Sequence, residues 1–365
     1  MRTRMVSHAA RRLSGAGIPL REPYDPAVDL RTAESLVVIA EGARAGIRRE
    51  DPESAAAIEA RYADMLEVLE WSLGAGQPDT GFRLAAALVP FWMSTKRIDD
   101  GDAWFRRALA QPDGSTARRA RASHDHGYLL FFSGRYDEAD PRFTESKTLA
   151  ETAGDANLVA LALAGAARVA LGRDPHEAVR LTRDAVAATD GTPPGDGRSS
   201  ALHVLGVALQ MSGDLQGARD VMTARLELGR AEGNEFVVWV ESANLSMVER
   251  QLGNFDHAER LSRNALSIAR ARGDAMAIPW IINGLAAVTA AQGQLERAAT
   301  LNGMAAAMLE RAGGEWPPDE LEQYEETLAA VSKGLPPAAI ERARAKGAAM
   351  STSEGVDFAL TPTPV

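Results

Sequence analysis

The side chains that could carry out chemistry are few in this chain, and they form no known catalytic motif. There is no cysteine, so a thiolate nucleophile and a cysteine metal site are both excluded. Neither Gly-x-Ser-x-Gly nor His-Glu-x-x-His occurs. Of six scattered histidines, only His124 and His126 lie close together, and two residues on a helix face different ways. We therefore expect no metal site.

A glycine-rich stretch and a carboxylate cluster are the remaining candidates for chemistry. Between Gly191 and Gly197 there are five residues where a phosphate-binding loop needs four, and Arg198 replaces its lysine. The stretch is better interpreted as a loop between helices. Four carboxylates near the end of the chain are typical of a solvated helix face: Glu320, Glu322, Glu325 and Glu326. The sequence thus predicts a protein that is not an enzyme and holds no cofactor.

A repeated phrase indicates the elements that position these side chains. A six-residue phrase begins at Gly134, Gly213, Gly253 and Gly293. It consists of glycine, any residue, an aromatic or leucine, any two residues and alanine. The last two intervals are each 40 residues, and the longer first interval leaves room for a copy at Gly172 with one extra residue. Lys96 occupies the glycine position of a degenerate earlier copy. A fixed period of this size indicates a helical solenoid.

Two further signals share this period. Seven residues before each loop glycine stands a small residue that lets a partner helix approach: Gly127, Gly165, Gly206, Ser246 and Ala286. Glycines also follow the expected second helices, where the left-handed conformation caps a helix end: Gly154, Gly233, Gly273 and Gly313. We predict an all-α fold, a right-handed superhelical solenoid of antiparallel helix pairs with a period of about 40 residues.

Four segments are expected along the chain. They are an N-terminal helix and connector (1–29), a helical segment leading into the array (30–76), the repeat array of about six helix pairs (77–314), and C-terminal capping helices with a tail (315–365). Within the second segment, one helix is predicted from Asp51 to Leu73, with Pro52 in its first turn.

The small residue, the loop glycine, the aromatic two positions later and the alanine three positions after it resemble the tetratricopeptide repeat. The usual period of that repeat is about 34 residues, so six additional residues would lengthen the helices. HEAT-type repeats share the longer period but lack the loop phrase, and they rank second.

A narrower resemblance covers roughly residues 30–360. Segments 61–73, 83–92 and 104–109 resemble the start of the C-terminal repeat region of LuxR-type and SARP-type transcription regulators of the STAND ATPase class. Segment 343–360 is similar to their closing helix, although Ala348 replaces its usual arginine. No Walker A loop or DNA-binding helix-turn-helix is found. The resemblance implies a sensor arm without its ATPase, either as a stand-alone relative or as a fragment.

The repeat register also predicts which side chains face the concave groove. Counted from the small residue of each first helix, the candidates for binding a ligand or partner are His124, Tyr128, His203, Gln210, Met211, Met247, Arg250, Gln251, Trp280 and Asn283. By contrast, Phe131, Phe132 and Trp239 are expected in the core between repeats. A flexible apolar wall with a few polar groups suits a peptide helix or a small effector.

Composition limits the possible partners. The net charge of −10 disfavours direct nucleic-acid binding, which normally needs a basic face. No apolar stretch reaches the roughly 18 residues that suggest a membrane span, and the absence of cysteine fits the cytoplasm. We expect a non-enzymatic module that binds a protein, peptide or small effector in transcriptional regulation. The alternative is a self-associating scaffold without a small ligand; the oligomeric state stays open.

Overall fold

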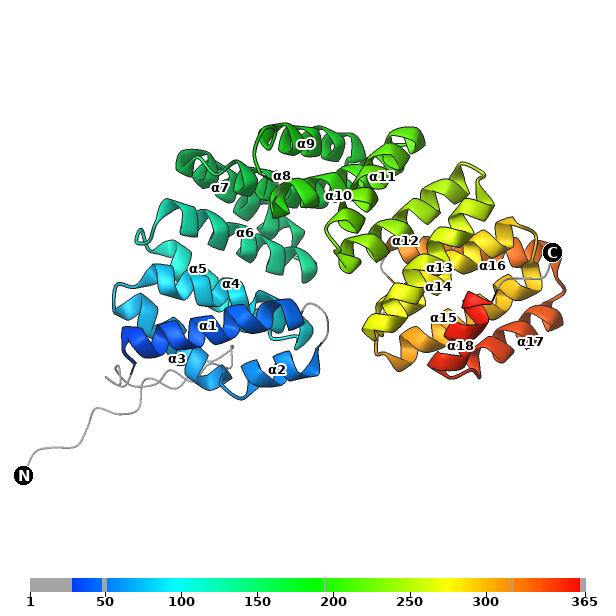
Figure 1. Cartoon of the computed structure of the whole chain (residues 1–365), viewed down its shortest axis with the longest axis horizontal. Coiled ribbons are helices and arrows are strands. Elements are labelled where there is room, and N and C mark those ends of the chain that lie inside the picture. The colour runs from blue at the N-terminus through cyan, green and yellow to red at the C-terminus, as the bar shows by residue number, and fades with distance from the viewer. Residues whose placement is uncertain (1–27, 48–50, 194, 315, 317, 362–365) are drawn as a thin grey trace, which may run out of the picture. The chain divides into compact units, whose positions relative to one another are not determined.

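The computed structural model describes residues 28–47, 51–193, 195–314, 316 and 318–361, and in these ranges it contains eighteen α-helices and no strand (Figure 1). This confirms the predicted all-α fold of antiparallel helix pairs. The chain divides into two compact units, residues 1–155 and 156–365. The division falls within the segment 77–314 that was expected to form one array. The proposed helix before residue 28 lies outside the described residues.

The first unit contains α1 to α7. Their bounds are α1 Leu30–Ile47, α2 Pro52–Glu59, α3 Tyr62–Gly74, α4 Pro78–Ser94, α5 Ile98–Ala110, α6 Thr116–Phe132 and α7 Tyr136–Ala153. The single helix predicted from Asp51 to Leu73 is wrong, because the chain breaks between α2 and α3. The break lets α2 pack mainly on α1 while α3 packs mainly on α4. The predicted start is confirmed: Asp51 caps α2 and Pro52 follows it.

The second unit contains α8 to α18. Their bounds are α8 Ala156–Leu171, α9 Pro175–Ala188, α10 Asp196–Met211, α11 Leu215–Ala231, α12 Glu235–Gln251, α13 Phe255–Arg272, α14 Ala277–Ala291, α15 Leu295–Arg311, α16 Pro318–Gly334, α17 Pro337–Ala348 and α18 Thr352–Leu360. Four antiparallel pairs follow one another: α8 with α9, α10 with α11, α12 with α13, and α14 with α15. Each new first helix packs on the preceding pair.

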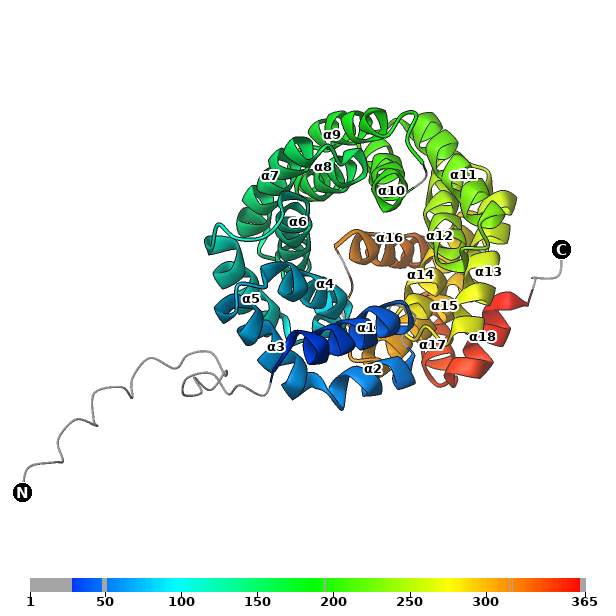
Figure 2. The ribbon, with the colours of Figure 1, turned by 60° about the vertical axis from the view of Figure 1, so that its left-hand side comes forward.

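The first helices of the second unit form one layer and the second helices another (Figure 2). We call the surface of α10, α12 and α14 that is turned away from α11, α13 and α15 the inner face. This arrangement follows from the small residues predicted on the first helices. A Cβ on Gly206 would lie 2.8 Å from Cγ of Met222 on α11, which is closer than such contacts allow. In the next pair, Ser246 Oγ donates to the carbonyl oxygen of Ala258 at 2.8 Å.

The backbone at the loops confirms the repeat register. The loop glycines have positive φ angles, from 76° at Gly134 to 87° at Gly213. Lys96 has a φ of 58°, which makes it the only described non-glycine residue in the left-handed region. The degenerate copy therefore keeps the loop conformation that glycine adopts elsewhere. The copy at Gly172, with its extra residue, has no positive φ angle at that glycine.

Helices α16 and α17 occupy the segment where capping helices were expected, after the last antiparallel pair. Helix α16 packs on α14 and α15, whereas α17 packs on α15 and touches α16 only slightly. The backbones of α15 and α17 approach closely, because a Cβ on Gly303 or Gly347 would collide with carbonyl oxygens of Arg344 or Thr300. Gly334 stands 41 residues after Gly293, but α16 and α17 do not repeat the close packing of the preceding pairs, and Gly334 has no positive φ angle.

Candidate binding surface

The predicted groove residues divide between the two units. His124 and Tyr128 lie on α6 of the first unit. The other eight lie on α10, α12 and α14 of the second unit: His203, Gln210, Met211, Met247, Arg250, Gln251, Trp280 and Asn283.

Hydrogen bonds join the candidate residues of α10 to α12. The amide Nδ2 or Nε2 atoms of asparagine and glutamine are donors that a polypeptide ligand could use. Gln210 Nε2 donates to Gln251 Oε1 at 3.2 Å, and both lie at the ends of their helices. Met211 beside them is half exposed, and Met247 is partly buried. Polar and flexible apolar side chains thus share one part of the inner face.

A buried ion pair holds His203 in place. Its Nδ1 lies 2.8 Å from Glu241 Oε1, and Glu241 on α12 is fully buried. The same carboxylate oxygen accepts a hydrogen bond from Arg225 of α11, whose Nε donates to the carbonyl oxygen of Ser199 at 2.9 Å. Three helices therefore meet at one carboxylate. Removing one partner would leave a buried charge, which is far costlier than losing a surface pair.

Asn283 does not reach an open surface. Its side chain is fully buried, and its Nδ2 donates to the carbonyl oxygen of Glu320 at 2.9 Å and to Glu320 Oε2 at 2.8 Å. Glu320 belongs to α16, which packs along α14. The expectation of an exposed groove position for Asn283 is corrected for this reason. Arg250 is also engaged by α16, with Nη2 3.7 Å from Glu326 Oε2, and Trp280 is partly buried.

In the first unit, His124 is buried and bonded within its own helix. Its Nδ1 lies 3.0 Å from Asp125 Oδ1, and its ring stacks on Tyr128 with centroids 6.1 Å apart. Arg121 Nε donates to both oxygens of Asp125. Burial alone would raise the pKa of Asp125, but Arg121 and His124 lower it to about 2. His124 therefore acts as a partner for the buried carboxylate of Asp125.

His126 faces the other way, as its spacing predicts. Its Nε2 lies 2.7 Å from Asp102 Oδ1, and its ring stacks on Phe105. Burial lowers the pKa of His126, while Asp102 opposes the shift. Arg135 Nη1 also donates to Asp102 at 2.6 Å. The carboxylate therefore links α5, α6 and the loop that follows α6.

Aromatic side chains continue along α6 beyond Tyr128. The ring centroids of Tyr128 and Phe132 are 4.6 Å apart, and those of Phe131 and Tyr136 are 5.3 Å apart. Phe132 is 50% exposed, so its predicted place in the core is wrong. Trp239 in the second unit is buried, which confirms its predicted place. Phe132 lies in the last turn of its helix, where it leaves one face of the ring to solvent.

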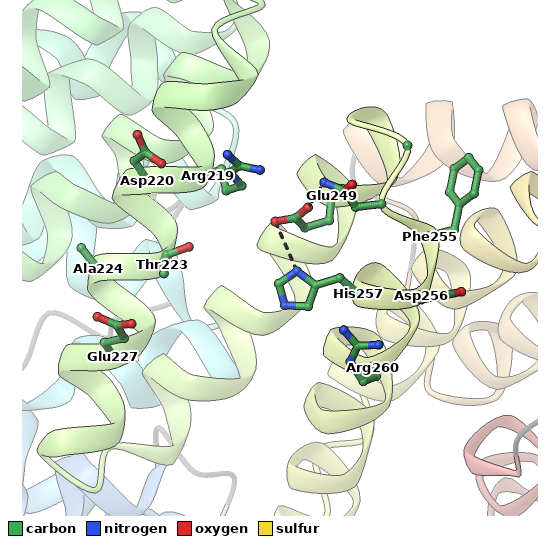
Figure 3. Close-up of a pocket in the computed structure, with 12 residues that line it drawn as sticks. Arg219, Asp220, Thr223, Ala224, Glu227, Glu249, Phe255, Asp256, His257 and Arg260 are labelled. Carbon is green, nitrogen blue, oxygen red and sulfur yellow. Dashed lines mark hydrogen bonds and ion pairs between the residues drawn. The ribbon is translucent and has the colours of Figure 1, made fainter.

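The structure also contains a cleft that was not predicted from the sequence. It has a volume of about 1060 Å³ and lies in the second unit, with α11 on one side and the loop and start of α13 on the other (Figure 3). Glu249 is buried at this cleft, where Asn254 Nδ2 donates to its Oε2 at 2.6 Å and His257 Nδ1 lies 3.3 Å from its Oε1. Asp220 and Glu227 line the α11 wall. They are seven residues apart and so lie on one face of α11, but nothing in the sequence places that face opposite α13.

Among the described residues, no group of three histidine, cysteine, aspartate or glutamate side chains is placed to hold a metal ion. In the same part of the chain, no helix combines the length and apolar character that crossing a membrane requires. The geometry consists instead of helix faces with polar and aromatic side chains, which can hold a ligand by hydrogen bonding and packing.

Comparison with known proteins agrees with the repeat register. Residues 243–272, which include most of α12 and all of α13, match the tetratricopeptide repeat family. No curated protein matches the chain in sequence.

Solved structures share the fold at low sequence identity. A Rap protein complexed with Competence and Sporulation Factor is 13% identical, with 85% of each chain covered and a TM-score of 0.57. A STAND protein with a tetratricopeptide repeat sensor from Pyrococcus horikoshii is 12% identical, with a TM-score of 0.56 over 88% of this chain and 53% of that protein. The apo quorum sensor NprR from B. thuringiensis is 11% identical, with 85% of each chain covered and a TM-score of 0.51. The chain thus spans about half of the STAND protein and most of the other two.

Proposed function

We propose that this chain is a non-enzymatic binding module that holds a peptide or protein segment on the inner face of α10, α12 and α14. The observation that carries the proposal is the set of donors and acceptors that joins α10 to α12. Gln210 and Gln251 bond across these two helices, and Arg250 directly precedes Gln251 in α12. Such side chains can bond to an extended or helical polypeptide without specifying a reaction.

The finer proposal is that the module serves as the sensor or interaction arm of a bacterial transcription regulator, or as a stand-alone relative of one. The segments that resemble LuxR-type and SARP-type regulators support it, and so does the fold shared with the sensor of a STAND protein. The Rap structure supports binding of a signalling factor, because that protein is seen in complex with one. The inner face has the mixture of polar and apolar groups that such a ligand needs.

A peptide-display selection tests the binding surface. Peptides from a random library are selected on the full chain, and their affinities are then measured for the Arg250→Glu variant. We expect at least about a tenfold loss, which corresponds to about 1.4 kcal/mol, because a charge reversal on the surface repels ligands that bonded to the guanidinium.

Arg260→Glu is the matched control, because Arg260 is an exposed arginine of α13 at the other cleft. It should leave the affinities unchanged. Selected peptides that bind the Arg250→Glu variant as well as the unsubstituted chain would remove the inner face from the proposal. A loss with Arg260→Glu alone would place binding at the cleft beside α11.

A further inference from the structure

The first half of α16 is attached to the inner face by polar side chains. Asn283 donates to Glu320, and Glu326 pairs with Arg250 at 3.7 Å. Gln323 lies between them, close to Gly284: a Cβ at that glycine would be 3.8 Å from Gln323 Nε2. Figure 2 shows α16 on the opposite side of α12 and α14 from α13. Helix α16 therefore contacts the same surface to which the proposed ligand binds.

These three residues of α16 recur every three positions, so they follow one face of the helix. Glu322 and Glu325 lie on the other side and are exposed. The acidic cluster is consequently divided. Two carboxylates point away from the inner face, and the other two contact donor groups of α12 and α14, although Glu326 stays largely exposed.

Little apolar surface holds this half of α16. Its buried residues are Gln323 and Thr327, which are both polar, whereas Leu321 is 40% exposed. The one aromatic side chain here, Tyr324, is partly buried, stacks on Trp316 and accepts a hydrogen bond from Arg344 of α17 at 2.7 Å. The first buried apolar residue is Val331, near the end of the helix. Because burial of apolar area supplies most of the stabilisation between packed helices, the first half of α16 is held more weakly than the second.

The contact also leaves polar atoms unmatched. Asn283 Oδ1, Gln323 Oε1, Arg250 Nε and Trp280 Nε1 are buried, and none has a hydrogen-bond partner among the described residues. A buried polar atom without a partner opposes the buried arrangement. The interface is therefore one from which α16 can be displaced at low cost, and a better-matched ligand can satisfy more of these atoms.

We propose that the first half of α16 is an internal ligand of the inner face, and that an acidic helical segment of the partner replaces it. The inference rests on the proposed function, since it takes the inner face as the binding surface. The surface under α16 continues into that face, because Arg250 is adjacent to Gln251, which bonds to Gln210.

The contacts of α16 define the chemistry of the incoming segment. Arg250 supplies a cation, and Asn283 supplies an amide donor. In α16, Glu320 and Glu326 lie six residues apart on one helical face, and their carboxylates reach Asn283 and Arg250. A partner helix with the same spacing of Asp or Glu reproduces these charge-assisted bonds. A basic segment would meet Arg250 without compensation.

A labelled peptide of residues 320–334 serves as the probe, and its affinity for the full chain is measured by fluorescence anisotropy. The host is a variant with Glu320→Ala and Glu326→Ala, which removes both carboxylates that contact Asn283 and Arg250 and leaves the bond from Asn283 to the backbone oxygen of residue 320. We expect this chain to bind the peptide about tenfold more tightly than the unsubstituted chain, since the internal competitor is weakened.

Glu322→Ala with Glu325→Ala is the matched control, because it removes two carboxylates from the exposed side of the same helix. This chain should bind the peptide no better than the unsubstituted one. Adding Arg250→Glu to the host should abolish binding. Equal affinity in all chains, or binding that survives Arg250→Glu, would overturn the proposal.

Hydrogen exchange provides a second measurement without a peptide. In the unsubstituted chain, amides of residues 321–328 should exchange faster than those in the middle of α15 and α17. Equal protection in the three helices would show that α16 does not open. The library selection on the unsubstituted chain does not depend on either result. A failure of the proposed replacement of α16 can therefore be told apart from a failure of the proposed function.

Discussion

At the scale of single residues, buried charge in the first unit depends on compensation by neighbours. Asp125 is almost completely buried, yet Arg121 and His124 keep its carboxylate ionised. Their attraction outweighs the cost of burial, because the pKa of Asp125 falls to about 2 even though burial acts to raise it. The carboxylate therefore stabilises the fold only while it carries its charge.

We predict that Asp125→Asn lowers the free energy of unfolding at pH 7 by about 2 kcal/mol, as a pKa lowered from its ordinary value of 3.8 to about 2 implies. The stabilisation is complete above the unfolded pKa and is lost as the pH falls from about 4 through about 2. Urea unfolding across this range should show a steep acid dependence in the unsubstituted chain and a shallower one in the variant.

Glu177→Gln is a suitable control, because Glu177 pairs with Arg180 at the surface and its pKa is also lowered. Solvent screens that pair, so the variant should unfold almost as the unsubstituted chain does. An equal loss of stability in both variants would show that burial of Asp125 is not the cause of the effect.

At the scale of elements, α16 and α17 differ in how they are held. Helix α17 packs backbone to backbone against α15 through Gly303 and Gly347, whereas the first half of α16 is held by polar side chains. Close backbone approach gives extensive dispersion contact and excludes any larger residue. Helix α17 is thus held firmly by the second unit, whereas the first half of α16 can be displaced.

We predict that Gly347→Ala destabilises the chain by about 1–3 kcal/mol, because the added methyl group would collide with the backbone of α15 at Thr300. Thermal unfolding followed by circular dichroism measures the change. Gly284→Ala is the control: it lies in α14 with only an ordinary contact nearby, and alanine favours a helix. A melting temperature that falls equally in both variants would mean that the backbone approach does not matter.

At the scale of the molecule, the repeat register was readable from the sequence because the loops impose a backbone requirement. Left-handed φ angles demand glycine, so the loop phrase recurs at a fixed period. Lys96 could also be assigned to a loop from its position in the period, although it is not a glycine. After Gly334 the phrase keeps Ala339 at its alanine position, but Pro336 replaces its aromatic or leucine, so the sequence showed no further copy there.

The binding surface could be predicted only in part, because exposure depends on neighbours that the period does not specify. Gln251 and Met211 are exposed on the helices where the register places them. Asn283, three positions before the small residue of α14, is buried instead, because Glu320 of α16 packs over it. The cleft beside Glu249 arises from the space between two second helices, and no single-sequence pattern describes that spacing.

Net charge decides how whole molecules meet in solution. At −10, copies of the chain repel one another at pH 7, and the repulsion vanishes near the pI of about 5.3. We predict that static light scattering at pH 7 gives the same molar mass over a concentration series, and that association appears as the pH approaches 5.3. This pH lies above the range in which Asp125 is protonated, so folded molecules should be the ones that associate. Circular dichroism at pH 5.3 checks that they are folded. A molar mass that rises with concentration at pH 7 and low salt would contradict the prediction and favour a self-associating scaffold, because attraction would then prevail where charge repulsion is strongest.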